Sequence, residues 1–178
     1  PALCNRIDRN TGGIVIAAKN AEALRILNDK IRGREIEKSY LCVVCGRPKP
    51  AEGRLEGYLF KDAVKNQVYV TKKPQPGAKT AVTEYRTLCS ARGLSLVECR
   101  LLTGRTHQIR VHMAHIGHPL LGDLVYGHKR PEKGLSGQCL HARALRFLHP
   151  RTGELVTFTC PLPDYFQDVL ARLGPPVG

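Results

Sequence analysis

The sequence predicts an α+β fold: a largely antiparallel mixed sheet flanked by helices and basic loops. Three observations predict it. Most apolar segments are short and either rich in β-branched residues or alternate between apolar and polar side chains, as strands do. Tight turns join several of them, which is typical of antiparallel neighbours. Only three segments carry helix start and stop signals. The 178 residues are enough for one domain with a substantial core.

The first half of the chain is expected to contain one helix among strands. An apolar run predicts a buried strand over 14–19. Asn20 is expected to cap a helix whose apolar residues repeat at helical spacing, and Gly33 to end it. Further strands are predicted over 37–45, 55–60 and 67–70, the last two as a hairpin. Lysines and prolines predict an exposed basic loop over 72–79.

The second half is also expected to combine strands with short helices. Two long strands are predicted over 81–89 and 94–102, with a tight turn between them and with one wetter face. Thr106 is expected to cap a short helix that ends at Ile116. The remaining predictions are a basic loop over 127–137, strands over 140–148 and 155–159, and a final helix over 163–173.

Composition favours an anionic partner. Lys and Arg number 28 against 15 Asp and Glu, a formal net charge of +13. Such an excess attracts polyanions, although an ordinary basic protein would share it. Arginines near the polar motifs favour nucleic acid. Only 6% of residues are aromatic and none is Trp, which disfavours a single-strand-binding barrel. No apolar run is long enough to suggest a membrane span, and no signal peptide is visible.

The cysteines predict a reducing, cytoplasmic environment. There are seven, an odd number without the spacing of a disulfide framework. Cys42 and Cys45 form a CxxC, but they lie inside a β-branched run and no second pair exists. A zinc or redox role for them is therefore disfavoured.

Asp8 is the main candidate for chemistry. It lies between Arg6 and Arg9 and is followed by Thr11 and two glycines before an apolar run. Alone it could be a turn residue that binds backbone amides. An arginine partner would orient the carboxylate for nucleophilic or base catalysis, and the glycines allow close approach of another chain or ligand. Spacing does not decide which arginine pairs with it.

A second polar block covers residues 102–112 and contains Arg105, Thr106, His107 and Arg110. The histidines here and just downstream could bind a metal, but they do not converge on one helical face, so we predict no metal. The block could also be an ordinary basic surface helix. An active-site helix that contacts RNA is the third interpretation.

Both blocks resemble the motifs of the RluA-type pseudouridine synthases. That family has roughly His-Arg-Leu-Asp-x-x-Thr-Ser-Gly and Gly-Arg-Thr-His-Gln-Leu/Ile-Arg-x-His. The resemblance implies that Arg110 pairs with a catalytic Asp8 and that Arg6 occupies the space left by a flipped uridine. Residues 37–44 resemble the Lys-x-Tyr motif, which implies that Tyr40 stacks on the target base and takes the C5 proton.

The similarity covers residues 5–163, including segments that match Gly-Asp-x-x-Tyr-Gly and Leu-His-Ala. Asn5 and Gly12 depart from the usual His and Ser, which leaves contacts around the site in doubt. We expect residues 1–178 to form the catalytic domain, and the natural protein to start earlier, because the first residues already belong to a motif.

The sequence therefore predicts an RNA pseudouridine synthase that needs no cofactor or metal and acts as a cytoplasmic monomer on ribosomal or transfer RNA, without an obligatory protein partner. A non-catalytic RNA-binding or chaperone domain of the same fold is the main alternative. A two-metal nuclease or a two-carboxylate glycosidase would need acidic partners that the sequence lacks. Expected catalytic residues are Asp8, Tyr40 and Arg110. Expected RNA contacts are Arg6, Arg9, Thr11, Arg105, Thr106, His107 and Ile109.

Overall fold

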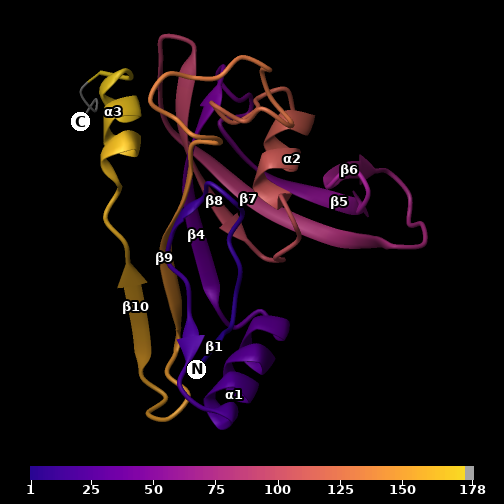
Figure 1. Ribbon diagram of the computed structural model, residues 1–178, viewed down its shortest axis with the longest axis vertical. Helices are drawn as coiled ribbons and strands as arrows, with labels where there is room; N and C mark the ends of the chain where they lie inside the picture. The colour runs from indigo at the N-terminus through magenta and orange to yellow at the C-terminus, as the bar shows by residue number, and fades with distance from the viewer. Residues whose placement is uncertain (175–178) are drawn as a thin grey trace.

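The computed structural model describes residues 1–174, and its main feature is one mixed sheet of eight strands (Figure 1). In spatial order the main path contains β10 (Leu155–Thr159), β9 (Leu140–Leu148), β4 (Glu37–Cys45), β8 (Leu94–Leu101), β7 (Ala78–Ala91), β5 (Glu52–Asp62) and β6 (Gln67–Thr71). Neighbours on this path are antiparallel, whereas β2 (Gly12–Gly13) joins β9 in parallel. The predicted α+β class is confirmed.

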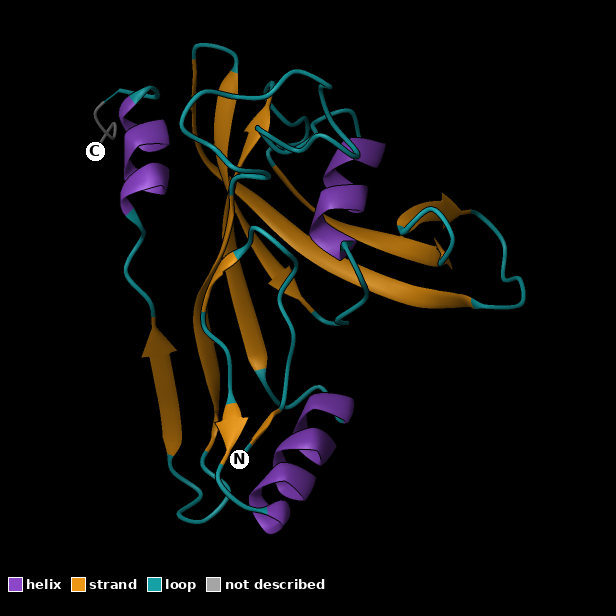
Figure 2. Ribbon diagram, viewed as in Figure 1, coloured by secondary structure: helices purple, strands orange, loops and turns teal. Residues whose placement is uncertain are grey.

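Helices cover both faces of the sheet because its central strands are apolar on both sides. Cys42 and Val44 pack in one cluster with α2 (Gln108–His115). Val43, between them in sequence, points the other way and packs with α3 (Asp164–Ala171). Successive residues of a strand face opposite sides, so β4 lies at the centre of the core. Figure 2 shows β5, β6 and the start of β7 extending away from this core as a wing.

The first helix forms as predicted. α1 (Ala21–Arg32) begins after Asn20, whose side chain accepts a hydrogen bond of 2.8 Å from the backbone N–H of Ala23. It ends at Gly33 and buries Leu27 against β9 residues (Leu145 and Phe147) at the lower end of the sheet (Figure 1). Among residues 1–174, no helix is long and apolar enough to cross a membrane.

The predicted buried strand over 14–19 is wrong. β2 ends just before this segment and β3 (Ala17–Ala18) is the strand within it; β3 pairs with β1 (Ala2–Leu3) in a separate two-stranded sheet. Gly13 has a φ of +117°, which turns the chain away from β9. Val15 is consequently 39% exposed. The apolar run links two sheets rather than crossing one.

The predicted cap of the second helix is also wrong. α2 begins after His107, which adopts a left-handed conformation with φ of 55° and makes no side-chain cap. The carboxamide oxygen of Gln108 instead accepts a hydrogen bond of 3.0 Å from the backbone N–H of Arg105. Thr106 is thereby left free to line the surface beside Asp8. The remaining predicted elements differ only at their ends, for example β7, which begins at Ala78 within the predicted basic loop.

We expect Gly13→Ala to destabilise the fold by about 3 kcal/mol, measured by urea unfolding. A Cβ at Gly13 would lie 2.3 Å from the carbonyl oxygen of Ala142, in a backbone conformation that L-residues avoid. Gly93→Ala is the matched control, because Gly93 has a φ of +79° but no other atom would lie within 4 Å of its added Cβ. The stability lost in Gly93→Ala therefore reflects backbone strain alone, and we expect it to be about 1 kcal/mol. Equal losses in the two variants would show that the close contact with β9 does not matter.

Candidate active site

The loop that carries Asp8 is fixed to β9 by its backbone. The Asp8 carbonyl accepts a hydrogen bond of 3.0 Å from the N–H of Thr11, which closes a turn. The Thr11 hydroxyl is buried and accepts a hydrogen bond of 2.9 Å from the side-chain amide of Gln138. Gly12 and Gly13 then pair with the start of β9. Asp8 therefore lies on a short, braced segment, with its side chain 24% exposed.

Arg110 lies between two carboxylates. Its Nη1 is 3.8 Å from Oδ2 of Asp8. Its other edge binds Asp123 in a bidentate pair, with Nε 2.7 Å from Oδ2 and Nη2 3.1 Å from Oδ1. Burial alone would lower the pKa of Arg110, but the hydrogen bonds to Asp123 and the charges of both carboxylates outweigh it and raise the pKa. The guanidinium is thus a permanent cation aimed at Asp8.

Asp123 and Tyr126 hold Arg110 in this position. Asp123 is 1% exposed, and its Oδ1 also accepts hydrogen bonds from the backbone N–H groups of Val125 and Tyr126 at 3.0 and 3.1 Å. Burial alone would raise the pKa of Asp123, but these bonds and Arg110 lower it. The Arg110 guanidinium carbon lies 5.1 Å from the centroid of the Tyr126 ring, a cation–π contact. Neither residue was among the predicted site residues, although both lie in the segment that resembles Gly-Asp-x-x-Tyr-Gly.

Strand register brings Tyr40 to the same place. Ala142 of β9 pairs with Gly13 on one side and with Tyr40 of β4 on the other. The pairing of β4 with β9 shifts between Ser39 and Tyr40, an irregularity of the kind that redirects side chains near functional sites. Burial, and secondarily the charge of Asp8, raises the pKa of Tyr40 to about 12. The phenol is therefore neutral at physiological pH.

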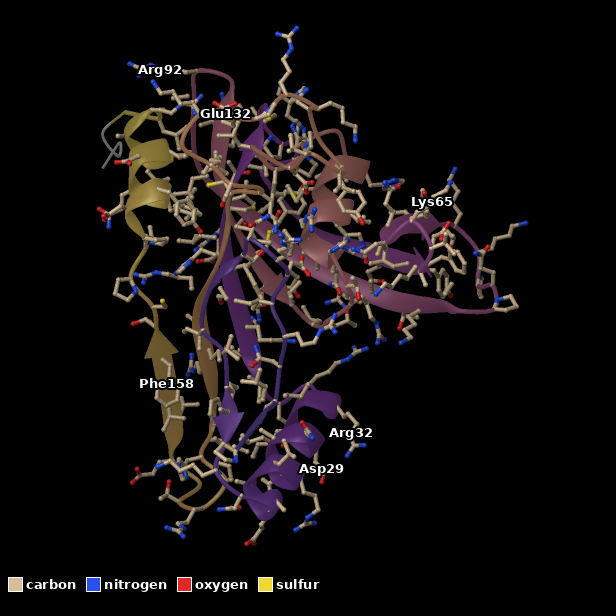
Figure 3. All side chains as sticks on the ribbon, viewed as in Figure 1. Asp29, Arg32, Lys65, Arg92, Glu132 and Phe158 are labelled. Carbon is tan, nitrogen blue, oxygen red and sulfur yellow. The ribbon has the colours of Figure 1, made fainter. Side chains whose placement is uncertain are left out.

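Asp8 lies where two hollows meet. The larger has a volume of about 910 Å³ and is also lined by Tyr40, Thr11 and Ile109. The smaller, about 380 Å³, extends from Asp8 toward the wing. Together we call them the groove. Its basic lining residues are Arg6, Arg9, Arg32, Arg34, Lys38, Lys61, Arg100 and Arg105, and its acidic ones are Asp8 and Glu37. In Figure 3, Arg32 marks the α1 side of the groove and Lys65 lies on the wing.

The predicted RNA contacts lie in different surroundings. Arg6 and Arg9 are exposed, and Thr106 lines both hollows. Arg105 donates a hydrogen bond of 2.8 Å from Nε to the carbonyl of Thr80. Ile109 is 4% exposed and belongs mainly to the core, with an edge on the larger hollow.

The histidines of the second polar block point to separate partners. His107 Nδ1 is 2.7 Å from the hydroxyl of Tyr126, and burial and the nearby Arg110 lower its pKa. His112 Nδ1 is 2.8 Å from the hydroxyl of Thr83, and burial lowers its pKa to about 4. Within residues 1–174, no three His, Cys, Asp or Glu side chains gather as metal ligands would. All seven cysteines are free.

The structure shows what Asn5 and Gly12, the two departures from the family motif, contact. Asn5 Oδ1 accepts a hydrogen bond of 2.7 Å from the backbone N–H of Ile16, so its amide fastens the loop to the segment before β3. A Cβ at Gly12 would lie 3.3 Å from His141 Nδ1 and 3.4 Å from the hydroxyl of Tyr165. A serine there would lie against these two polar groups.

Comparison with known proteins agrees with this fold. The family model described as RNA pseudouridylate synthase matches residues 1–115, so the chain belongs to the RNA pseudouridylate synthase family. Curated relatives named ribosomal large subunit pseudouridine synthases C and D place it among the RluA-type members.

Three proteins illustrate how similar this chain is to known sequences and structures. An uncharacterized RNA pseudouridine synthase of Chloroflexus aurantiacus is 40% identical over 173 residues, which are 97% of this chain and 54% of that protein. Ribosomal large subunit pseudouridine synthase D of Haemophilus influenzae is 38% identical over 183 residues, 96% of this chain and 55% of that protein. The structure of human RNA pseudouridylate synthase domain containing 4 superposes with a TM-score of 0.81 at 26% identity, over 97% of this chain and 75% of that one. The chain spans about half the length of the curated relatives it matches.

Proposed function

We propose that this chain is the catalytic domain of an RNA pseudouridine synthase and that Asp8 is its essential carboxylate. The observation that carries the proposal is the position of Asp8 in a basic groove, beside a buried arginine that a second carboxylate holds in place. The charge of the groove suits RNA, and the free cysteines are compatible with the cytoplasmic location that we propose. We further propose that the protein acts as a monomer.

The reaction we assign cuts the bond between ribose C1′ and uracil N1, rotates the base and joins C1′ to C5. N1 gains a proton and C5 loses one, so no oxidant, reductant or co-substrate is consumed. Asp8 would act either by attacking C1′ or by removing the proton from C2′. Arg110 would fix the direction of the carboxylate in both cases.

Access to a stacked uridine requires flipping it out of the RNA helix, which costs a few kcal/mol. Arg6 is exposed at the groove, and its flat guanidinium can stack in the space that the uridine leaves. Basic residues of the groove and wing would bind phosphates on either side. The names of several relatives support ribosomal RNA as the substrate class, and transfer RNA is a second candidate.

Tritium release from RNA labelled at uridine C5 tests the activity directly. Separate ribosomal and transfer RNA pools from cells that lack this protein are the substrates. Release from either pool supports a synthase and identifies the RNA class. Binding of both pools without release, also in the full-length protein, would instead favour a non-catalytic RNA-binding domain.

Tyr40→Phe should lower turnover by ~10²–10⁴-fold, the usual contribution of a proton-transferring side chain. The ring would still stack on the uracil, but it could no longer take the proton from C5. A phenol with a pKa of about 12 must give up its own proton as it receives this one, so the hydroxyl acts as a relay. Single-turnover tritium release measures the loss. Tyr58→Phe on β5 is the control, and unchanged turnover in Tyr40→Phe would leave Tyr40 with a stacking role alone.

A further inference from the structure

Lys38 is a half-buried cation in the groove without an anionic partner. It is the second residue of β4, and burial lowers the pKa of its ammonium group. The adjacent acid, Glu37, pairs with Arg100 at 3.1 Å. Among residues 1–174, Lys38 makes neither an ion pair nor a side-chain hydrogen bond. An ammonium held partly out of water without a counter-charge costs free energy that a bound anion would recover.

The backbone places Lys38 on the same face of the sheet as Tyr40. The register of β4 with β8 is continuous here, with Lys38 opposite Leu101 and Tyr40 opposite Cys99. Alternate residues of a strand share a face, and two residues span roughly 6.6 Å. Both side chains line the larger hollow, as does Leu101. The cation and the aromatic ring are therefore neighbours along one wall of the groove.

The loop after β8 leaves room for the ammonium. A Cβ at Gly104 would lie only 2.9 Å from Nζ of Lys38, so a larger residue here would displace the end of the lysine side chain. The glycine is exposed and lines the same hollow. The ammonium thus lies against bare backbone at the groove surface, where a ligand can reach it.

We propose that Lys38 binds a backbone phosphate of the uridine that enters the site. This inference rests on the proposed function, since it takes the base to lie on Tyr40. A single nucleotide can span the two side chains, with its base on the ring and its phosphate on the ammonium. A phosphate, unlike a uracil carbonyl, also supplies the counter-charge that Lys38 lacks.

The test is binding of fluorescent 9-mers of uridine and of cytidine across a range of salt concentrations. Lys38→Met keeps the length of the side chain and removes its charge. We expect about tenfold weaker binding of both oligomers and a salt dependence, log Kd against log salt, smaller by ~0.7, the value for one phosphate on a single strand. Lys19→Met, an exposed lysine outside the groove, should change both quantities much less.

Three results would overturn the proposal: unchanged binding by Lys38→Met, an equal loss in Lys19→Met, or a loss confined to the uridine oligomer, which would indicate a base contact. Thermal unfolding checks that the variant is folded, and Lys38→Gln provides a second uncharged variant. The assay measures no turnover. If the wild type releases tritium and Lys38→Met binds the oligomers normally, only this inference is refuted. If the wild type releases no tritium and Lys38→Met binds the oligomers more weakly than the wild type, only the proposed function is refuted.

Discussion

Asp8→Asn is expected to reduce tritium release at least ~10⁴-fold while leaving RNA affinity within about twofold. Asparagine has nearly the shape of aspartate but can neither attack the ribose carbon nor accept a proton. The fold should tolerate the change, because Arg110 keeps its bidentate pair with Asp123 and loses only a contact of 3.8 Å to Asp8. The groove gains one unit of positive charge, which favours RNA binding slightly.

Asp168→Asn is the matched control, since it makes the same chemical change on the exposed face of α3. Release and binding should both stay at the wild-type level in this protein. Substantial release by a pure preparation of Asp8→Asn would refute the assignment of Asp8 as the essential carboxylate. Loss of RNA binding together with release would indicate instead that Asp8 shapes the loop.

Asp123→Asn is expected to produce the second large effect, about 3–5 kcal/mol of lost stability and a fall in turnover of ~10²-fold. The change leaves the buried Arg110 facing a neutral amide, whose NH₂ group cannot accept its hydrogen bonds. The guanidinium would then shift, and with it the direction of Asp8. Urea unfolding and single-turnover tritium release measure the two effects.

A double-mutant cycle that combines Asp123→Asn with Arg110→Met measures the interaction free energy between these two side chains, apart from their contacts with the rest of the protein. The double variant should be more stable than Asp123→Asn alone, because it contains no unpaired buried cation. Both variants with Arg110→Met should lack turnover. If the stability losses of the two substitutions simply add, the buried pair is not the coupled unit that its geometry indicates.

The same pair predicts an acid sensitivity with a definite sign. The pKa of Asp123 is lower in the folded protein than the ordinary aspartate value of 3.8. Its contribution to stability is therefore complete above the unfolded pKa and is lost as pH falls through the folded pKa. Unfolding below about pH 4 should be less steep in Asp123→Asn than in the wild type.

Local patterns in the sequence determined most of the secondary structure. The bounds of β4, β9 and β10 coincide with the predicted segments. The signals used there, β-branched runs and the alternation of apolar with polar residues, depend only on neighbours along the chain. Asn20 capped its helix for the same reason. Residues 14–19 and Thr106 were assigned wrongly because distant groups compete there. Gly13 pairs with β9, and α2 begins after His107, with the side chain of Gln108 accepting a hydrogen bond from the N–H of Arg105.

The amino-acid sequence by itself also determined the basic charge, and its motifs, through their resemblance to a family, selected Asp8, Tyr40 and Arg110. Spacing alone did not decide which arginine lies beside Asp8, and only the resemblance implied Arg110. That Asp123 holds this arginine from the other side was not predicted and is seen in the tertiary structure alone. Asp8 and Arg110 are far apart in sequence and meet because the Asp8 loop pairs with β9, β9 pairs with β4, and α2 packs on that face. Contacts of this kind depend on strand register and helix packing, which no local pattern specifies.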